Sequence, residues 1–90
     1  MRDMENVMAQ IARTPKQLGN ALRRHRTHIG LSQSQVAAKA GLRQATISQI
    51  ENGHDATKVE TICALLAALD LELTVASRSK GSSQDIEDIF

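Results

Sequence analysis

The chain has 90 residues, a length that supports one small hydrophobic core and excludes a second folded domain of ordinary size. Phe90 is the only aromatic residue, so the core must be built from aliphatic side chains, which favours a mainly α fold over a β-sandwich. The net charge of +1 hides an uneven distribution: residues 6–50 carry seven Lys and Arg and no acid, whereas residues 51–90 carry eight acids and three bases.

Residues 1–13 form an N-terminal arm in which apolar residues recur at helical spacing. We expect this arm either to form a short amphipathic helix that docks on the body or to fray as a chain end. The residues with this spacing are Met4, Val7, Met8 and Ile11.

The first helix of the main domain, which we expect to span residues 14–76, has clear start and stop signals. Thr14 provides an N-cap, Pro15 suits the first helical position, and Gln17 completes a capping box. Gly30 suits the left-handed conformation that ends a helix. The helix should bury a stripe formed by Leu18, Leu22 and Ile29.

Two short helices follow, separated by a tight turn. Ser32 and Gln35 form a second capping box, which predicts a helix over residues 33–40, and Gly41 suits the left-handed residue that ends it. Helical spacing resumes and predicts a third helix over residues 44–51. The residues expected to pack on the internal face of these helices are Val36, Ala37, Ala40, Leu42, Ile47 and Ile50.

A fourth helix is predicted by a third capping box, formed by Thr57 and Glu60. Asp70 is expected to close it. Its apolar positions form a wide core stripe made of Val59, Ile62, Cys63, Leu65, Leu66 and Leu69.

The last third of the chain changes character twice. The apolar period falls from 3.6 to 2 over residues 71–76, which predicts a half-buried strand through Leu71, Leu73 and Val75 that has no partner within the chain. Residues 77–90 are polar and acidic, and we expect a flexible tail there. This tail is either an inert terminus or a partner-binding segment that uses Ile86, Ile89 and Phe90.

The second and third helices have the features of a helix-turn-helix unit. Ala37 is small where the two helices cross, and Ile47 fills the angle between them. The polar residues that point elsewhere carry no charge, and such side chains suit base edges, while the surrounding basic residues suit phosphates. An ordinary solvated surface is the alternative for any one of these residues, which are Gln33, Gln35, Gln44, Ser48 and Gln49.

The segment GLSQSQVAAKAGLRQATISQIENG, from Gly30 to Gly53, resembles the lambda-repressor-like or Xre family of helix-turn-helix proteins, and the likeness extends over residues 15–70. The resemblance implies a domain of four or five helices whose third helix enters the major groove of DNA. It implies base contacts by Gln44, Ala45, Ser48 and Gln49, and phosphate contacts by Gln33 and Asn52. Phosphate contacts are also expected from Arg43, Ser32 and Lys39.

Two positions within this resemblance affect the stability of the domain and not only its contacts with DNA. Arg43 stands where the family usually has a Ser or Thr cap, and a cation at a helix N-terminus is unfavourable unless a phosphate lies near it. Arg26 and Glu51 match a family pair that joins the first helix to the end of the third, which favours a structural role for Arg26 over a DNA contact.

A narrower resemblance is to the HipB antitoxins, on the segments TPKQLGNAL, QATIS and LELTV. It implies a homodimer formed through the C-terminal β-strand, and a dual role in which the protein represses its operon and neutralises a HipA-type serine/threonine kinase toxin. The alternatives are a phage-type or metabolic Xre regulator without a toxin partner, and an adaptor that binds only protein.

Other chemistry is not expected. No glycine-rich phosphate loop or activated nucleophile is visible, so we do not expect an enzyme or a cofactor. His25 and His28 have metal-ligand spacing but no third ligand, so we expect no metal site. Cys63 is the single cysteine and is expected in the core. Without an apolar run long enough for a membrane span or a signal peptide, the chain should be cytoplasmic and associated with the nucleoid.

Overall fold

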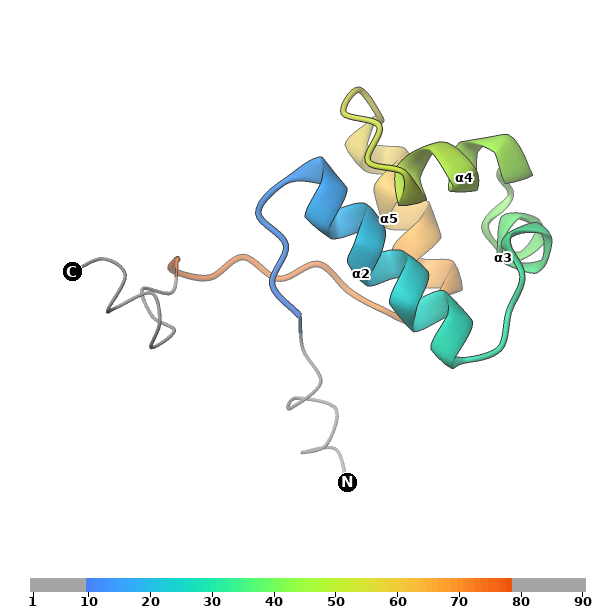
Figure 1. Ribbon diagram of the computed structural model, residues 1–90, viewed down its shortest axis with the longest axis horizontal. Helices are drawn as coiled ribbons and strands as arrows, with labels where there is room; N and C mark the ends of the chain where they lie inside the picture. The colour runs from blue at the N-terminus through green and yellow to red at the C-terminus, as the bar shows by residue number, and fades with distance from the viewer. Residues whose placement is uncertain (1–9, 79–90) are drawn as a thin grey trace.

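The computed structural model describes residues 10–78, which contain four helices: α2 (Pro15–His28), α3 (Gln33–Ala40), α4 (Gln44–Glu51) and α5 (Val59–Ala68) (Figure 1). In this view α5 lies behind α2, and α3 lies at the far end of the molecule from the two described chain ends. The predicted mainly α fold is confirmed. Within the described residues, no helix is both long and apolar enough to cross a bilayer.

A single aliphatic core joins the four helices, as the composition predicts. Leu18, Leu31, Leu42, Ile62, Ala68 and Leu71 pack against it while remaining partly exposed. The fully buried members are Leu22, Val36, Ala37, Ile47, Ile50, Leu65, Leu66 and Leu69.

The predicted boundaries of α3 and α4, on either side of the turn at Gly41, are confirmed to the residue. Thr14 Oγ1 accepts a hydrogen bond from the Gln17 backbone N–H at 3.0 Å at the start of α2. Ser32 and Gln35 form the reciprocal capping box of α3, with bonds of 3.0 and 2.8 Å. Gly41 adopts φ 73°, a conformation that a side chain would strain, and so ends α3 and turns the chain toward α4.

The beginning and outer face of α5 differ from the prediction. Its N-cap is Lys58 and not Thr57, and no side chain caps the helix, so the third predicted capping box is wrong. Val59 is 70% exposed and Cys63 is also exposed, so neither belongs to the core. The physical reason is that the other helices cover only the face of α5 that holds Leu65, Leu66 and Leu69.

Ile29 was expected to be buried and is not, and of the two alternatives for the arm, the described part does not form a docked helix. Ile29 is 42% exposed because it is the C-cap of α2, past the face that packs on the core. Ile11 is 66% exposed, and residues 10–13 are not helical. The other residues of the predicted arm helix, Met4, Val7 and Met8, lie outside the described residues.

The segment after α5 does not form the predicted strand in the single chain: residues 71–78 have no regular secondary structure. Leu71 still packs against the core, and its N–H donates to Leu66 O at 2.8 Å. Leu73 is 60% exposed and Val75 is 94% exposed. A strand needs a neighbour to satisfy its backbone hydrogen bonds, and residues 10–78 of a single chain offer none here.

Candidate nucleic-acid interface

The α3–α4 pair owes its rigidity to small and fully buried side chains at the crossing. Ala37 is 4% exposed and Ile47 is 0% exposed, which confirms the positions predicted for them. The Leu42 N–H donates to Ala37 O at 2.9 Å and fixes the turn between the two helices. The outer face of α4 is therefore held in one orientation relative to α3.

The close approach of α2 to α4 depends on a residue that the sequence analysis missed. Gly19 is buried in α2, and a Cβ placed on it would lie 2.3 Å from Ile50 O and 2.8 Å from Glu51 O. No flexible side chain could move aside there, because both atoms belong to the backbone of α4. Gly19 thus sets the distance between α2 and the end of α4. A glycine in the interior of an otherwise favourable helix was the available signal.

The four residues predicted to contact bases share the outer part of α4. Gln44, Ala45 and Gln49 are exposed, and Ser48 is half-buried. Gln44 and Ser48 lie one turn apart, as do Ala45 and Gln49, so the four side chains form one continuous surface. This surface presents amide and hydroxyl groups without a formal charge.

The first of these residues is held in place by α3. Gln44 Oε1 accepts a hydrogen bond from Ser34 Oγ at 3.1 Å, and Gln44 Nε2 donates to Gln33 Oε1 at 3.4 Å. A side chain that is already oriented loses less entropy when it binds a base. Ser34 was not predicted to contribute to the site.

Gln33 connects this surface to a buried ion pair. Its Nε2 donates to Glu51 Oε1 at 3.1 Å, so the amide is engaged within the chain on both sides. Glu51 is 4% exposed and receives two more bonds from Arg26, at 2.6 Å from Nε and 3.0 Å from Nη2. Arg26 Nη1 also donates to Leu31 O at 2.8 Å.

The Arg26–Glu51 pair confirms the structural role predicted for Arg26. Its geometry is bidentate, which is the strong arrangement for a guanidinium and a carboxylate. Hydrogen bonding to Glu51 raises the pKa of Arg26 above its usual value, and this effect outweighs the lowering caused by burial. The pair joins α2 to the end of α4, and all three guanidinium nitrogens of Arg26 are engaged within the chain.

Some of the residues predicted to contact phosphates already form hydrogen bonds within the chain, and others do not. Arg43 and Lys39 are exposed, and Arg43 occupies the N-cap position of α4 without any side-chain cap, as predicted. The Ser32 hydroxyl accepts the capping bond from Gln35 N, which leaves its own hydrogen available to donate. Asn52 Nδ2 donates to Ser48 O at 2.9 Å and so is partly engaged in ending α4.

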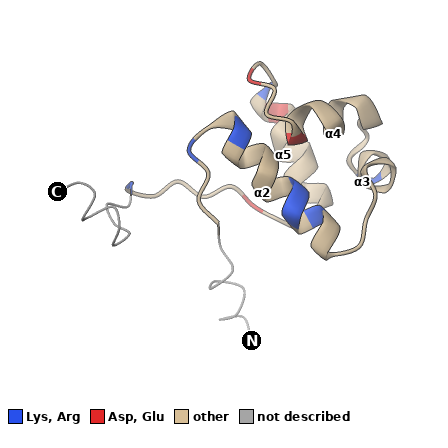
Figure 2. Cartoon of the chain, in the orientation of Figure 1, with Lys and Arg blue, Asp and Glu red and all other residues tan. Residues whose placement is uncertain are grey.

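Charge is distributed unevenly over the molecule. Among the described residues, most Lys and Arg lie before α4, on and just before α2 and on α3, with Lys58 before α5 and Arg78 after it as exceptions, whereas Asp and Glu occur at the end of α4, in the loop that follows it, at the start of α5 and after α5 (Figure 2). The first groups would attract a polyanion and the second would repel it.

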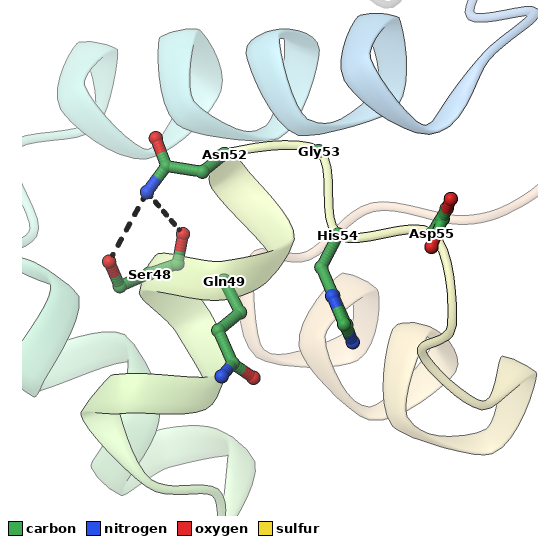
Figure 3. Close-up of a pocket in the computed structure, with 6 residues that line it drawn as sticks. All are labelled: Ser48, Gln49, Asn52, Gly53, His54 and Asp55. Carbon is green, nitrogen blue, oxygen red and sulfur yellow. Dashed lines mark hydrogen bonds between the residues drawn. The ribbon is translucent and has the colours of Figure 1, made fainter.

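An open hollow of about 390 Å³ continues the α4 surface at its C-terminal end. It lies where α4 meets the loop to α5 (Figure 3). Among the residues from 10 to 78, no group of three or more His, Cys, Asp and Glu side chains could hold a metal ion. The hollow is lined by Ser48, Gln49, Asn52, Gly53, His54 and Asp55.

Comparison with known proteins gives consistent results. A family model described as Helix-turn-helix matches residues 22–75. The chain is 38% identical over 74 residues to Antitoxin HipB of Escherichia coli (strain K12), covering 82% of this chain and 84% of that protein.

Solved structures resemble the fold as well. A complex described as HipA-HipB-O2-O3 contains a chain that matches with a TM-score of 0.74 and 38% identity, over 79% of this chain and 100% of that one. A HipB-O4 20mer complex gives the same values. The restriction-modification controller protein C.AhdI from Aeromonas hydrophila matches with a TM-score of 0.60 and 34% identity, over 64% of this chain and 84% of that one.

Proposed function

The chain belongs to the helix-turn-helix family and, within it, to the HipB antitoxins, and from this premise we propose that it is a DNA-binding antitoxin that represses its own operon and binds a HipA-type kinase toxin. The observation that carries the proposal is the outer face of α4. There, uncharged polar side chains are exposed together, and Gln44 is oriented by two residues of α3. Such a protein acts on the chromosome, which places it on the nucleoid in the cytoplasm.

In this function α4 enters the major groove and its outer residues read base edges. Gln44 is the principal reader, since its amide can form two bonds with adenine. Arg43 contacts a phosphate, and this contact compensates for its unfavourable place at the N-terminus of α4. The other proposed base contacts are Ala45, Ser48 and Gln49, and the other proposed phosphate contacts are Gln33, Ser32, Lys39 and Asn52.

The binding unit is a homodimer on a palindromic operator. Leu71, Leu73 and Val75 form a strand that pairs with the same strand of a second copy, which satisfies the backbone groups and covers the exposed side chains. Two copies related by a two-fold axis then present two α4 helices to neighbouring major grooves.

Two measurements on the full chain test the proposal. A gel-shift titration against promoter DNA of its own operon should show binding that is stronger than to random DNA and that weakens with salt. Mass spectrometry of proteins that co-purify at endogenous level should identify a HipA-type kinase. DNA binding without a co-purifying kinase would favour an Xre regulator that has no toxin partner, and the absence of specific DNA binding would contradict repression.

The acidic tail is the proposed site of additional contact with the toxin. Ile86, Ile89 and Phe90 are interleaved with three acids, so the apolar side chains enter a groove of the partner while the charges guide the encounter. These residues lie outside the described part of the chain. A chain ending at Asp85 should bind the toxin more weakly in calorimetry while its dimerisation and DNA affinity stay unchanged. Unchanged toxin affinity would leave the tail without this role.

A further inference from the structure

His25 of α2 is a half-buried side chain that the proposed function leaves unused. Its Nε2 lies 3.1 Å from Leu69 O, the carbonyl oxygen at the C-cap of α5. A carbonyl oxygen can only accept a hydrogen bond, so the imidazole ring donates it. The last carbonyls of a helix have no partner within that helix, and His25 thus satisfies one of them from another helix.

This bond lies where the C-terminal segment leaves the helical body. Asp70 adopts φ 61°, a left-handed conformation that Asp tolerates better than most side chains, and turns the chain just after Leu69. The Leu71 N–H donates to Leu66 O at 2.8 Å, while residues 72–78 are all exposed. The direction of the segment is therefore set at positions 69 to 71. In Figure 1 the segment runs away from α3, toward the described N-terminal end of the chain.

Arg26 is the next residue along α2 and holds the end of α4. It binds Glu51 through two hydrogen bonds of 2.6 and 3.0 Å. Glu51 in turn accepts a hydrogen bond from Gln33, which contacts Gln44 on the proposed base-reading surface. Neighbouring residues of a helix lie about 1.5 Å apart along its axis, so a single turn of α2 holds the C-terminal ends of both α4 and α5.

From this geometry we propose that His25 is a positioning residue for operator recognition, which determines the half-site spacing that the protein accepts. The inference rests on the proposed function, in which two copies pair through the strand that begins at Leu71. A change in the angle at which this strand leaves α5 moves the whole second copy and its α4. One added base pair shifts a half-site by about 3.4 Å and rotates it by about 35°, so the preferred spacing reports how firmly that angle is held.

A histidine that only stabilised the fold would act differently. Its loss would lower the folded fraction and weaken binding to every operator by the same factor. Loss of positioning weakens binding to the natural spacing more than to altered spacings, because a loosened connection lets the two α4 helices adjust to them. The ratio of the affinities for natural and altered spacing therefore separates the two roles.

The test measures the affinity of the full chain for promoter DNA of its own operon, with the natural spacing and with one base pair inserted or deleted between the half-sites that footprinting locates. Wild type should prefer the natural spacing by at least about tenfold, because an out-of-phase half-site loses base contacts. His25→Leu has no donor, and the amide of His25→Asn is one methylene group shorter than that of Gln. Both should reduce the preference by about three- to tenfold, as expected for the loss of one hydrogen bond.

Two further variants serve as controls. His25→Gln carries an amide nitrogen as many bonds from Cα as Nε2 of the ring, so it should restore the preference. The Thr27 hydroxyl donates to Arg24 O at 3.0 Å, so Thr27→Val also removes a bond from an α2 side chain to a backbone carbonyl, but one within the same helix. It should keep the wild-type preference. Circular dichroism verifies that each variant is folded.

The outcomes separate this inference from the proposed function. Equal losses on all three DNAs for His25→Leu and His25→Asn, or an unchanged preference, would overturn the positioning role. A wild type that accepts all three spacings equally, yet still prefers promoter DNA to random DNA, would overturn it as well and leave the repressor function standing. If wild type does not distinguish promoter DNA from random DNA, the repressor function itself is wrong, and the inference with it.

Discussion

The α3–α4 pair and residues 71–78 both carry strong apolar patterns, but only the first forms the element that its pattern predicts. In the helix pair, Ile47 is 0% exposed and Ala37 is 4% exposed. In the C-terminal segment, Leu73 and Val75 alternate correctly for a strand yet are 60% and 94% exposed. The difference is that other described residues cover the helix pair and leave the C-terminal segment largely uncovered. A periodic pattern thus names candidates for burial, and of these two regions only the one that is covered forms its predicted element.

The largest expected effect comes from breaking the self-contained region. Ile47→Ala removes a fully buried side chain at the crossing of α3 and α4, where the neighbouring helices cannot close the space. We expect the free energy of unfolding, measured with denaturant, to fall by about 2–5 kcal/mol.

The matched control for that change lies on the open face of α5. Val59→Ala removes atoms from a side chain that is 70% exposed, and it should change the free energy of unfolding by less than about 0.5 kcal/mol. A large fall in the free energy of unfolding for Val59→Ala would mean that a second copy covers the open face of α5. The helices would then also depend on a partner chain for their burial.

A second change should act only on the region that lacks a partner. Leu73→Pro removes a backbone donor from the middle of the proposed strand, so we expect a monomer that has lost operator binding but retains most of its helical circular dichroism. Leu73→Val, which keeps the donor and an apolar side chain, should remain a dimer. Sedimentation that finds Leu73→Pro still dimeric would contradict pairing through this strand.

Much of the fold could be predicted because its signals are local. The caps at Thr14 and Ser32 and the turn at Gly41 involve residues only a few positions apart, and α3 and α4 have the predicted boundaries. The start of α5 could not be located in this way. Thr57 and Glu60 have the spacing of a capping box, but the helix begins at Val59, one residue later than that box requires. Cys63 was misplaced because an apolar helix position says nothing about how many faces have neighbours.

For the candidate site, the sequence named individual residues but not the hydrogen bonds between them. Gln33, Gln44 and Glu51 were each identified from the sequence, yet their hydrogen bonds join positions 11 and 18 residues apart. The close approach at Gly19 spans an even longer separation. Such contacts depend on the crossing of helices, which no local pattern specifies.

A third change tests whether the surface of the helix pair is as well determined as its interior. Gln44→Ala should weaken binding to promoter DNA by about 1–3 kcal/mol and leave binding to random DNA nearly unchanged, because a base contact is lost and no phosphate contact is affected. Competition gel shifts with both DNAs measure the two values. Equal losses on the two DNAs would show that Gln44 does not read bases.

The smallest expected effect concerns Arg43, the residue beside Gln44 and the uncapped N-terminus of α4. In the free protein its charge opposes the helix dipole, so Arg43→Ala should leave the free energy of unfolding within about 0.5 kcal/mol of wild type. In the proposed complex the same charge meets a phosphate, so the variant should bind promoter and random DNA with equal losses and with a log-log salt slope reduced by roughly 0.9. An unchanged slope would exclude the phosphate contact. A slope reduced together with a loss confined to promoter DNA would instead assign Arg43 to a base, because only a base contact depends on sequence.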